Sequence, residues 1–191
     1  MTAELPDLIA LGGYCGAGKD SVAKILVEKY GYHRIAFADA LRKVLLEMNP
    51  LIPTAEGAVN LAHIIGDVGW DVAKRQNPEV RRLMEELGEG IRYHVDSEAW
   101  VTAAMSAARF HHRVVITDLR HGAEFDALAD YWDAMTVWIE RPDTAPLSDH
   151  PSQTSLIAAD FGHVLHNKGS LTDLGAEVGS LLHDLFGVEA A

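Results

Sequence analysis

Short apolar runs alternate with helix-patterned segments along this chain. Residues 8–11 form an apolar run that ends at two glycines, which predicts a buried strand. Apolar residues then recur at helical spacing from Val22 to Tyr30, and Gly31 predicts the end of that helix. Further apolar or β-branched runs predict strands at 34–37, 113–118, 136–139 and 163–166. This alternation predicts an α/β fold of three layers, with a five-stranded, mostly parallel sheet covered by helices.

The segment after the second predicted strand is patterned less clearly. Asp39 is expected to cap a helix whose apolar stripe ends at Met48. Residues 49–54 contain two prolines and predict a loop, and a short helix is expected before Gln76.

The remaining helices have recognisable ends. Asn77 and Pro78 predict the start of a long helix, and another helix is expected at about 98–109. Residues 141–155 are polar, hold three prolines and predict a surface loop or lid. Ser170 and Asp173 predict a capping box at the start of the last helix.

Composition limits the class of protein. The chain has 191 residues, of which 48% are hydrophobic and 23% are charged, as expected for one soluble domain. Its net charge of −12 disfavours nucleic acid and anionic membranes as partners, and a small anionic substrate would need a local concentration of positive charge. The single cysteine, Cys15, excludes an internal disulfide, and no apolar run is long enough to span a membrane. The first residues show no signal peptide, so a cytoplasmic protein is expected.

A glycine-rich segment follows the first predicted strand. Residues 13–19, G-Y-C-G-A-G-K, fit the phosphate-binding loop pattern G-x-x-x-x-G-K between a strand and a helix. Glycines let backbone N–H groups turn toward phosphate oxygens, and Lys19 would reach the terminal phosphates. Asp20 stands where Ser or Thr is usual, and Ser21 follows. The alternative is a glycine-rich turn with an exposed lysine.

Two charged residues lie at the end of the most strongly β-branched run, 113–118. Asp118 is its last residue, where an acid beside magnesium is expected, and Arg120 lies two residues later at the same carboxyl edge. The alternatives are an Asp that caps a helix and an arginine that is solvated.

Other polar clusters have simpler explanations. Arg81 and Arg82 lie four residues before two glutamates, and the sequence alone favours surface ion pairs for them; Arg42 is equally ambiguous. The ten histidines show no metal-ligand spacing. Residues 167–170, N-K-G-S, are similar to the N-K-x-D of GTPases, but Ser170 replaces the acid, which favours a turn before the last helix.

Several segments together resemble the phage-type deoxynucleoside monophosphate kinases of the P-loop kinase superfamily. Residues 18–21 resemble their G-K-D-[ST] motif, which accounts for Asp20. Residues 37–42 are similar to F-A-D-P-[LI]-[KR], with Ala40 in place of proline.

The later matches follow in the family's order. Residues 81–88 resemble R-R-L-[ML]-Q-x-L-G, and the W-V at 100–101 follows. Residues 114–120 resemble V-V-x-P-D-x-R, with Glu124 as a later acid. Segments 139–142 and 167–171 are similar to the closing segments, so the resemblance extends from residue 8 to about 175.

The resemblance implies a single P-loop kinase domain over 1–191, with a helical monophosphate-binding region at about 38–110 and a lid at about 141–156. It implies transfer of the ATP γ-phosphoryl group to a deoxynucleoside 5′-monophosphate with Mg²⁺ as cofactor and small nucleotides as partners. It leaves a homodimer open. A kinase of another small acceptor, such as dephospho-coenzyme A, and a nucleotide-binding module without phosphotransfer remain alternatives.

The site residues that the resemblance implies fall into four groups. The catalytic group comprises Lys19, Asp118 and Arg120. The ATP-binding group comprises Gly13, Gly16, Ala17, Gly18, Lys19, Asp20, Ser21 and Arg141. The substrate-binding group comprises Asp39, Arg42, Arg81, Arg82, Gly88, Trp100, Asp118, Arg120 and Glu124. The metal ligands are expected to be Ser21 and Asp118.

Overall fold

The computed structural model describes residues 4–146, 148–149 and 151–188. The absence of a signal peptide was predicted from the first residues, and residues 1–3 lie outside the described residues. Two residues of the predicted lid, Leu147 and His150, also lie outside them. The chain forms two compact units. The sheet unit runs to Phe37 and resumes at Ala104, and the helical unit spans residues 38–103. No described helix is both long enough and apolar enough to cross a membrane.

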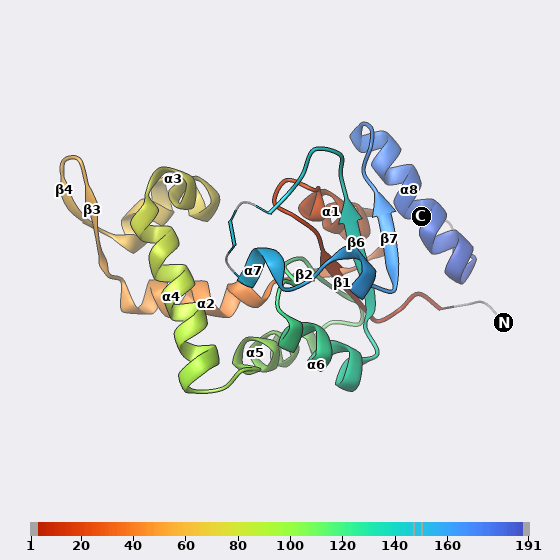
Figure 1. Ribbon diagram of the computed structural model, residues 1–191, viewed down its shortest axis with the longest axis horizontal. Helices are drawn as coiled ribbons and strands as arrows, with labels where there is room; N and C mark the ends of the chain where they lie inside the picture. The colour runs from red at the N-terminus through yellow and green to blue at the C-terminus, as the bar shows by residue number, and fades with distance from the viewer. Residues whose placement is uncertain (1–3, 147, 150, 189–191) are drawn as a thin grey trace. The chain divides into compact units, whose positions relative to one another are not determined.

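A five-stranded parallel sheet forms the centre of the sheet unit (Figure 1). Its strand order is β2-β5-β1-β6-β7, and each neighbouring pair is parallel. Ile9 lies opposite Val115 on one side of β1 and opposite Met135 on the other, so β1 is central. The predicted sheet is confirmed, with strands β1 (Leu8–Gly12), β2 (His33–Ile35), β5 (Val114–Ile116), β6 (Met135–Glu140) and β7 (His163–His166).

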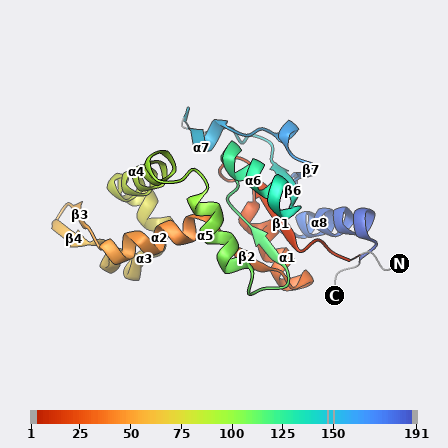
Figure 2. The same cartoon turned by 90° about the horizontal axis from the view of Figure 1, so that it is seen from below.

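Helices cover both faces of this sheet. Helices α1 (Lys19–Tyr30) and α8 (Leu171–Phe186) bury Leu26, Val178 and Leu182 in one core with residues of β1 and β6. Helix α6 (Gly122–Trp132) connects β5 to β6, and this connection crosses the sheet in the opposite direction to the one that α1 makes from β1 to β2. Because such crossovers are right-handed, α6 lies on the other face of the sheet from α1 (Figure 2).

The connection from β6 to β7 is irregular, as predicted for a surface loop, apart from two short elements. These are α7 (Pro151–Thr154) and the 3-10 helix η1 (Ala158–Asp160). After β7, the Ser170 side chain accepts from the N–H of Asp173, which confirms the capping box at the start of α8.

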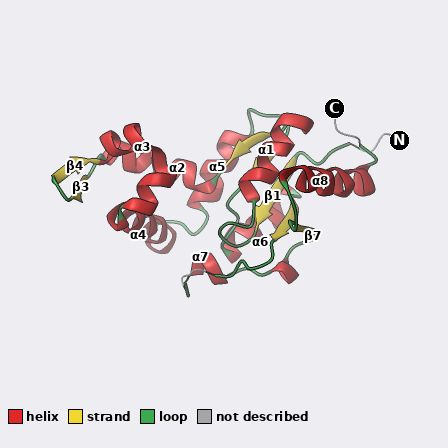
Figure 3. Ribbon diagram, turned by 90° about the horizontal axis from the view of Figure 1, so that it is seen from above, coloured by secondary structure: helices red, strands yellow, loops and turns green. Residues whose placement is uncertain are grey.

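The helical unit consists mainly of helices, with one small hairpin (Figure 3). Its elements are α2 (Phe37–Met48), β3 (Leu51–Thr54), β4 (Gly57–Asn60), α3 (Leu61–Gln76), α4 (Pro78–His94) and α5 (Ala99–Ala108). The boundaries between the two units fall at the start of α2 and within α5. The start of α4 is confirmed, because the Asn77 side chain accepts from the N–H of Glu79.

The loop predicted at 49–54 is wrong, because β3 and β4 form an antiparallel hairpin there. Proline is tolerated in a two-stranded sheet, where each strand has an outer edge, and Pro53 lies opposite Ala58. Ile52 is fully buried, so one apolar side chain anchors a strand that is otherwise polar or exposed.

Two helices differ from their predicted limits. Helix α3 is longer than predicted, and it is kinked at Gly69, whose φ of 73° breaks the helical pattern. Helix α2 begins at Phe37, so Asp39 lies inside the first turn and is not the cap. The N–H of Phe37 instead donates to Oδ1 of Asp118 at 2.8 Å, a cap from a residue distant in sequence.

Candidate active site

The glycine-rich loop connects β1 to α1 in the strand–loop–helix order that a phosphate-binding loop requires. Gly13, Gly16 and Gly18 have φ values of 134°, 80° and 106°, which residues with a Cβ rarely adopt. The N–H of Ala17 donates to the carbonyl of Tyr14 at 3.1 Å and closes a turn within the loop. Gly18 caps the start of α1, where the helix dipole favours an anion.

Lys19 is buried, unlike the exposed lysine of the alternative interpretation, with 8% of its surface accessible. Its Nζ donates to the carbonyls of Gly13 at 2.5 Å and of Tyr14 at 2.9 Å. The pKa of the Lys19 ammonium is lowered to about 8, chiefly by burial and also by the charge of Arg120. Cys15, Asp20 and Asp118 act in the opposite direction on this pKa. The loop thus holds a cation that is poorly hydrated.

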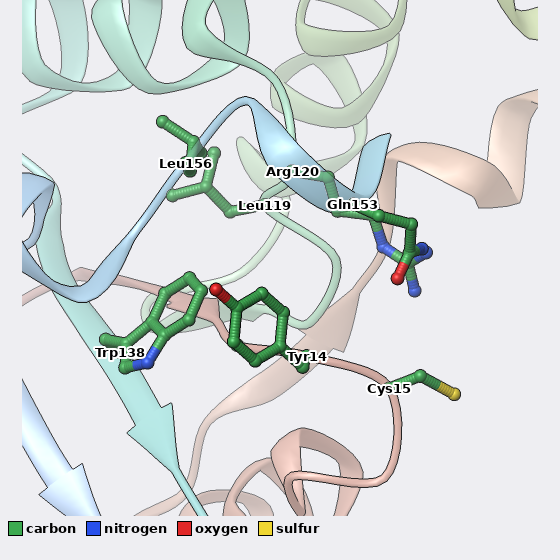
Figure 4. Close-up of a pocket in the computed structure, with 8 residues that line it drawn as sticks. Tyr14, Cys15, Leu119, Arg120, Trp138, Gln153 and Leu156 are labelled. Carbon is green, nitrogen blue, oxygen red and sulfur yellow. The ribbon is translucent and has the colours of Figure 1, made fainter. Parts of the chain in front are cut away.

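Asp118 and Arg120 follow β5 and are both half-buried. The Asp118 carboxylate caps α2, as described above, which gives the capping alternative a structural basis. The Arg120 side chain lines a small cavity with Tyr14 and Cys15 of the loop, and Figure 4 shows it beside Gln153. This geometry brings Lys19, Asp118 and Arg120 together at the carboxyl edge of β1 and β5.

Glu124 supports this edge from inside the protein. Only 2% of Glu124 is accessible, and its Oε2 accepts from the backbone N–H groups of Arg120 at 3.1 Å and His121 at 3.2 Å. Glu124 therefore fixes the backbone that carries Arg120.

A larger cleft, of about 520 Å³, lies beside the loop in the sheet unit. The ring of Tyr14 meets Trp138 edge to face at 5.2 Å, and both residues line the cleft and the small cavity (Figure 4). Nη1 of Arg141 lies 3.4 Å from the carbonyl of Gly16, which joins the start of the β6–β7 connection to the loop. The cleft is lined by Tyr14, Trp138, Glu140, Arg141, Pro142, Thr144, Ile157, Ala158, Ala159 and Lys168.

The arginines of α4 are both exposed but differ in their partners. Arg82 donates to Glu86 at 2.5 Å and to Glu79 at 2.6 and 2.7 Å, so surface pairing is confirmed for Arg82. These hydrogen bonds lower the pKa of Glu79. Arg81 has no hydrogen bond or ion pair among the described residues, and the expected pair with Glu85 does not form there.

The other expected substrate residues of the helical unit make internal contacts. Arg42 pairs with Asp39 on α2 at 3.0 Å. The buried indole of Trp100 donates to the carbonyl of Gly88 at 3.1 Å. A Cβ at Gly88 would lie 3.2 Å from Leu41, so these residues pack α2, α4 and α5 within the unit.

Sequence reasoning missed Asn167, which precedes α8. It is buried, and its Nδ2 donates to the carbonyl of Ala17 in the loop at 2.8 Å. It also missed the cleft residues Tyr14, Trp138 and Lys168. The only sequence signals were the position of Tyr14 inside the loop motif and the N-K-x-D likeness of 167–170.

Among the described residues, no three His, Cys, Asp or Glu side chains gather as a metal cluster. Oxygen ligands suited to a hard cation are nevertheless present: the hydroxyl of Ser21, half-buried in the first turn of α1, and the carboxylate of Asp118. Asp20 of the same turn is exposed.

The comparisons with known proteins agree with this geometry. The family model for deoxynucleotide monophosphate kinase matches residues 54–178. The chain belongs to this family. The phosphate loop at 13–19 lies outside the matched range and supports the assignment separately. No curated protein matches the chain in sequence.

Solved structures share the fold. A dephospho-CoA kinase from Campylobacter jejuni matches with a TM-score of 0.50 and 12% identity, covering 96% of this chain and 98% of its own. A shikimate kinase from Acinetobacter baumannii, in complex with shikimate, matches with a TM-score of 0.50 and 14% identity, covering 95% and 96%. The predicted P-loop kinase fold is confirmed. This family member is therefore a phosphotransferase, a kinase of nucleotides or other small molecules.

Proposed function

We propose that this kinase transfers the γ-phosphoryl group of ATP to a deoxynucleoside 5′-monophosphate, giving the diphosphate and ADP. The observation that carries the proposal is the buried Lys19 in a phosphate loop, with Arg120 and Asp118 at the carboxyl end of the adjacent strand. Ligands of open α/β sheets bind at this edge. The family description and the resemblance of residues 81–88 and 114–120 support a monophosphate as acceptor.

ATP would bind through the loop and the adjoining cleft. The N–H groups of the loop from Gly13 to Gly18 and the start of α1 would hold its phosphates, with Asp20 and Ser21 at the helix start. The cleft beside Tyr14, with Arg141 and Lys168 on its wall, has room for the rest of the nucleotide. The lid, at about 141–156, would exclude water.

The chemistry requires charge neutralisation more than covalent participation. An oxygen of the acceptor phosphate attacks the γ-phosphorus, and the bond to the bridging oxygen of ADP breaks. Lys19 and Arg120 would stabilise the negative charge on the transferring group, because their cations are already desolvated or half-buried.

Ser21 and Asp118 fit a magnesium ion by the chemistry of their oxygens. A bound ion would neutralise charge on the ATP phosphates. Asp118 would combine this role with capping α2, because a carboxylate has several acceptor positions.

The acceptor residues are proposed from the family resemblance. Among them, Arg81 is the most available to bind the acceptor phosphate, since it is exposed and makes no ion pair among the described residues. Arg82 would have to exchange Glu79 and Glu86 for phosphate. Asp39, Arg42, Gly88, Trp100 and Glu124 would then support the acceptor site through the packing and capping contacts described above.

The resemblance also leads us to propose the metabolic context of the activity and the domain organisation of the chain. The activity would belong to phage-type deoxynucleotide metabolism in the cytoplasm. The helical unit and the adjoining segment to about residue 110 would form the monophosphate-binding region of one kinase domain.

ADP release with ATP and Mg²⁺ over a panel of nucleoside monophosphates and dephospho-coenzyme A tests the proposal. We expect release with at least one deoxynucleoside monophosphate. Release with dephospho-coenzyme A alone would replace the acceptor assignment. Nucleotide binding without release on any acceptor would indicate a binding module instead.

A further inference from the structure

Asn167 connects three segments at the carboxyl edge of the sheet. Its backbone N–H donates to the carbonyl of Glu140 at the end of β6 at 2.7 Å. Its side-chain Nδ2 donates to the carbonyl of Ala17 at 2.8 Å. The amide is buried, so both bonds are protected from water and the loss of either would leave an unpaired polar group.

The bond to Ala17 fixes the peptide between Ala17 and Gly18. This peptide is trans and planar, so its carbonyl and the following N–H point in opposite directions. With the carbonyl held by Asn167, the N–H of Gly18 faces away from Asn167. That N–H belongs to the loop donors that would meet the phosphates of ATP.

The same contact explains the last glycine of the loop motif. Gly18 has a φ of 106°, and a Cβ built on it would lie 2.5 Å from Nδ2 of Asn167. A side chain at residue 18 would therefore displace the amide that holds the loop. The absence of a side chain at Gly18 therefore leaves the space that the Asn167 amide occupies.

We propose that Asn167 is a positioning residue for triphosphate binding. It acts through the Ala17–Gly18 peptide and keeps the loop N–H groups in the orientation that phosphate requires. The inference rests on the proposed function only in that the loop binds a triphosphate. It gives the N-K-G-S segment a role beyond the turn, because Asn167 holds the loop while Lys168 lines the cleft.

The test is the dissociation constant of inorganic tripolyphosphate, measured calorimetrically for the wild-type chain, Asn167→Ser and Asn167→Leu. Serine removes the amide without adding charge, and leucine keeps the branched shape of the side chain without its polar atoms. Asn77→Ser is the matched control, because Nδ2 of Asn77 also donates to a carbonyl, that of Pro53, at 2.9 Å. Serine at 77 can still cap α4. Circular dichroism and the thermal midpoint report folding of each variant.

We expect both Asn167 variants to bind tripolyphosphate roughly tenfold or more weakly, at temperatures where they are folded, and Asn77→Ser to bind like the wild type. Wild-type affinity in either folded Asn167 variant would overturn the inference and leave the proposed function intact. Loss of secondary structure in both variants would show that Asn167 is needed for folding, and would also overturn the inference. A wild-type chain that fails to bind tripolyphosphate would overturn both the inference and the proposed function.

Discussion

The phosphate loop and helix α4 both carry cationic side chains, but they hold them by different means. In the loop, Lys19 is buried against carbonyls, and residues distant in sequence, Asn167 and Arg141, reach the backbone. On α4, Arg82 is exposed and pairs with glutamates of its own helix. The loop is therefore organised before any ligand binds, whereas the α4 cations must lose water or partners when they bind an anion.

This difference predicts the largest effect for the loop lysine. Lys19→Ala should lower kcat about 10²–10³-fold, because the variant lacks a preorganised cation beside the transferring group. Steady-state kinetics with the best acceptor measure the loss, and Lys24→Ala is the control, an exposed lysine of the same helix. Near-wild-type turnover in a folded Lys19→Ala chain would contradict the role of the loop.

The second prediction separates the two arginines of α4. Arg81→Ala should raise the acceptor KM about 10- to 100-fold and leave the ATP KM unchanged, as expected for loss of a charge-assisted phosphate contact. Arg82→Ala should raise it less, because Arg82 is already paired.

Arg81→Lys should restore the acceptor KM only in part, because lysine lacks the planar fork. Arg75→Ala, at an exposed arginine of α3, is the control and should change neither KM. If both α4 alanine variants kept the wild-type KM for every monophosphate, the acceptor site would lie elsewhere.

The third prediction concerns pH. Because burial lowers the pKa of Lys19 to about 8, tripolyphosphate affinity should fall by up to about tenfold per pH unit above that value. Unfolding does not explain such a fall. The unfolded state keeps the ordinary Lys pKa of 10.5 and binds more protons, so this group makes the fold more stable as pH rises from about 8 to 10.5. Calorimetric titration across this range measures the effect, and a flat profile would mean that Lys19 stays charged.

The smallest kinetic effect is expected at Asp118. Asp118→Asn should raise the magnesium requirement about tenfold if the carboxylate helps to hold the ion. The asparagine oxygen can still accept from the N–H of Phe37, so the thermal midpoint should hardly change. Asp118→Ala, in contrast, should lower the free energy of unfolding by about 1 kcal/mol through loss of the cap. An unchanged magnesium dependence in Asp118→Asn would leave only the capping role.

The sheet unit could be predicted from the sequence because its signals are local. Each strand is a short apolar run, and Gly31 and Ser170 mark helix ends that depend on neighbouring residues only. The hairpin at β3 and β4 was missed, because Pro53 suggests a loop unless the partner strand is known. The length of α3 was missed because Gly69 interrupts its pattern.

The candidate site was predictable only where its signals are local. The loop motif gave Lys19 and its glycines, but the bond from Asn167 to Ala17 joins residues 150 positions apart. Nothing in the local pattern shows that the Asp118 carboxylate reaches Phe37. Contacts of this kind depend on the folded chain. The pairs of Arg82 with Glu79 and Glu86 are local to α4 in contrast, and the sequence predicted the pair with Glu86.

The most direct test of the central claim follows the phosphoryl group itself. The chain is incubated with Mg²⁺, ATP labelled in its γ-phosphoryl group and each deoxynucleoside monophosphate in turn, and the products are separated. The label is expected in the diphosphate of at least one deoxynucleoside, and it should be greatly reduced with Lys19→Ala. Label that stays in ATP or appears only as inorganic phosphate, with every monophosphate tested, would contradict the account.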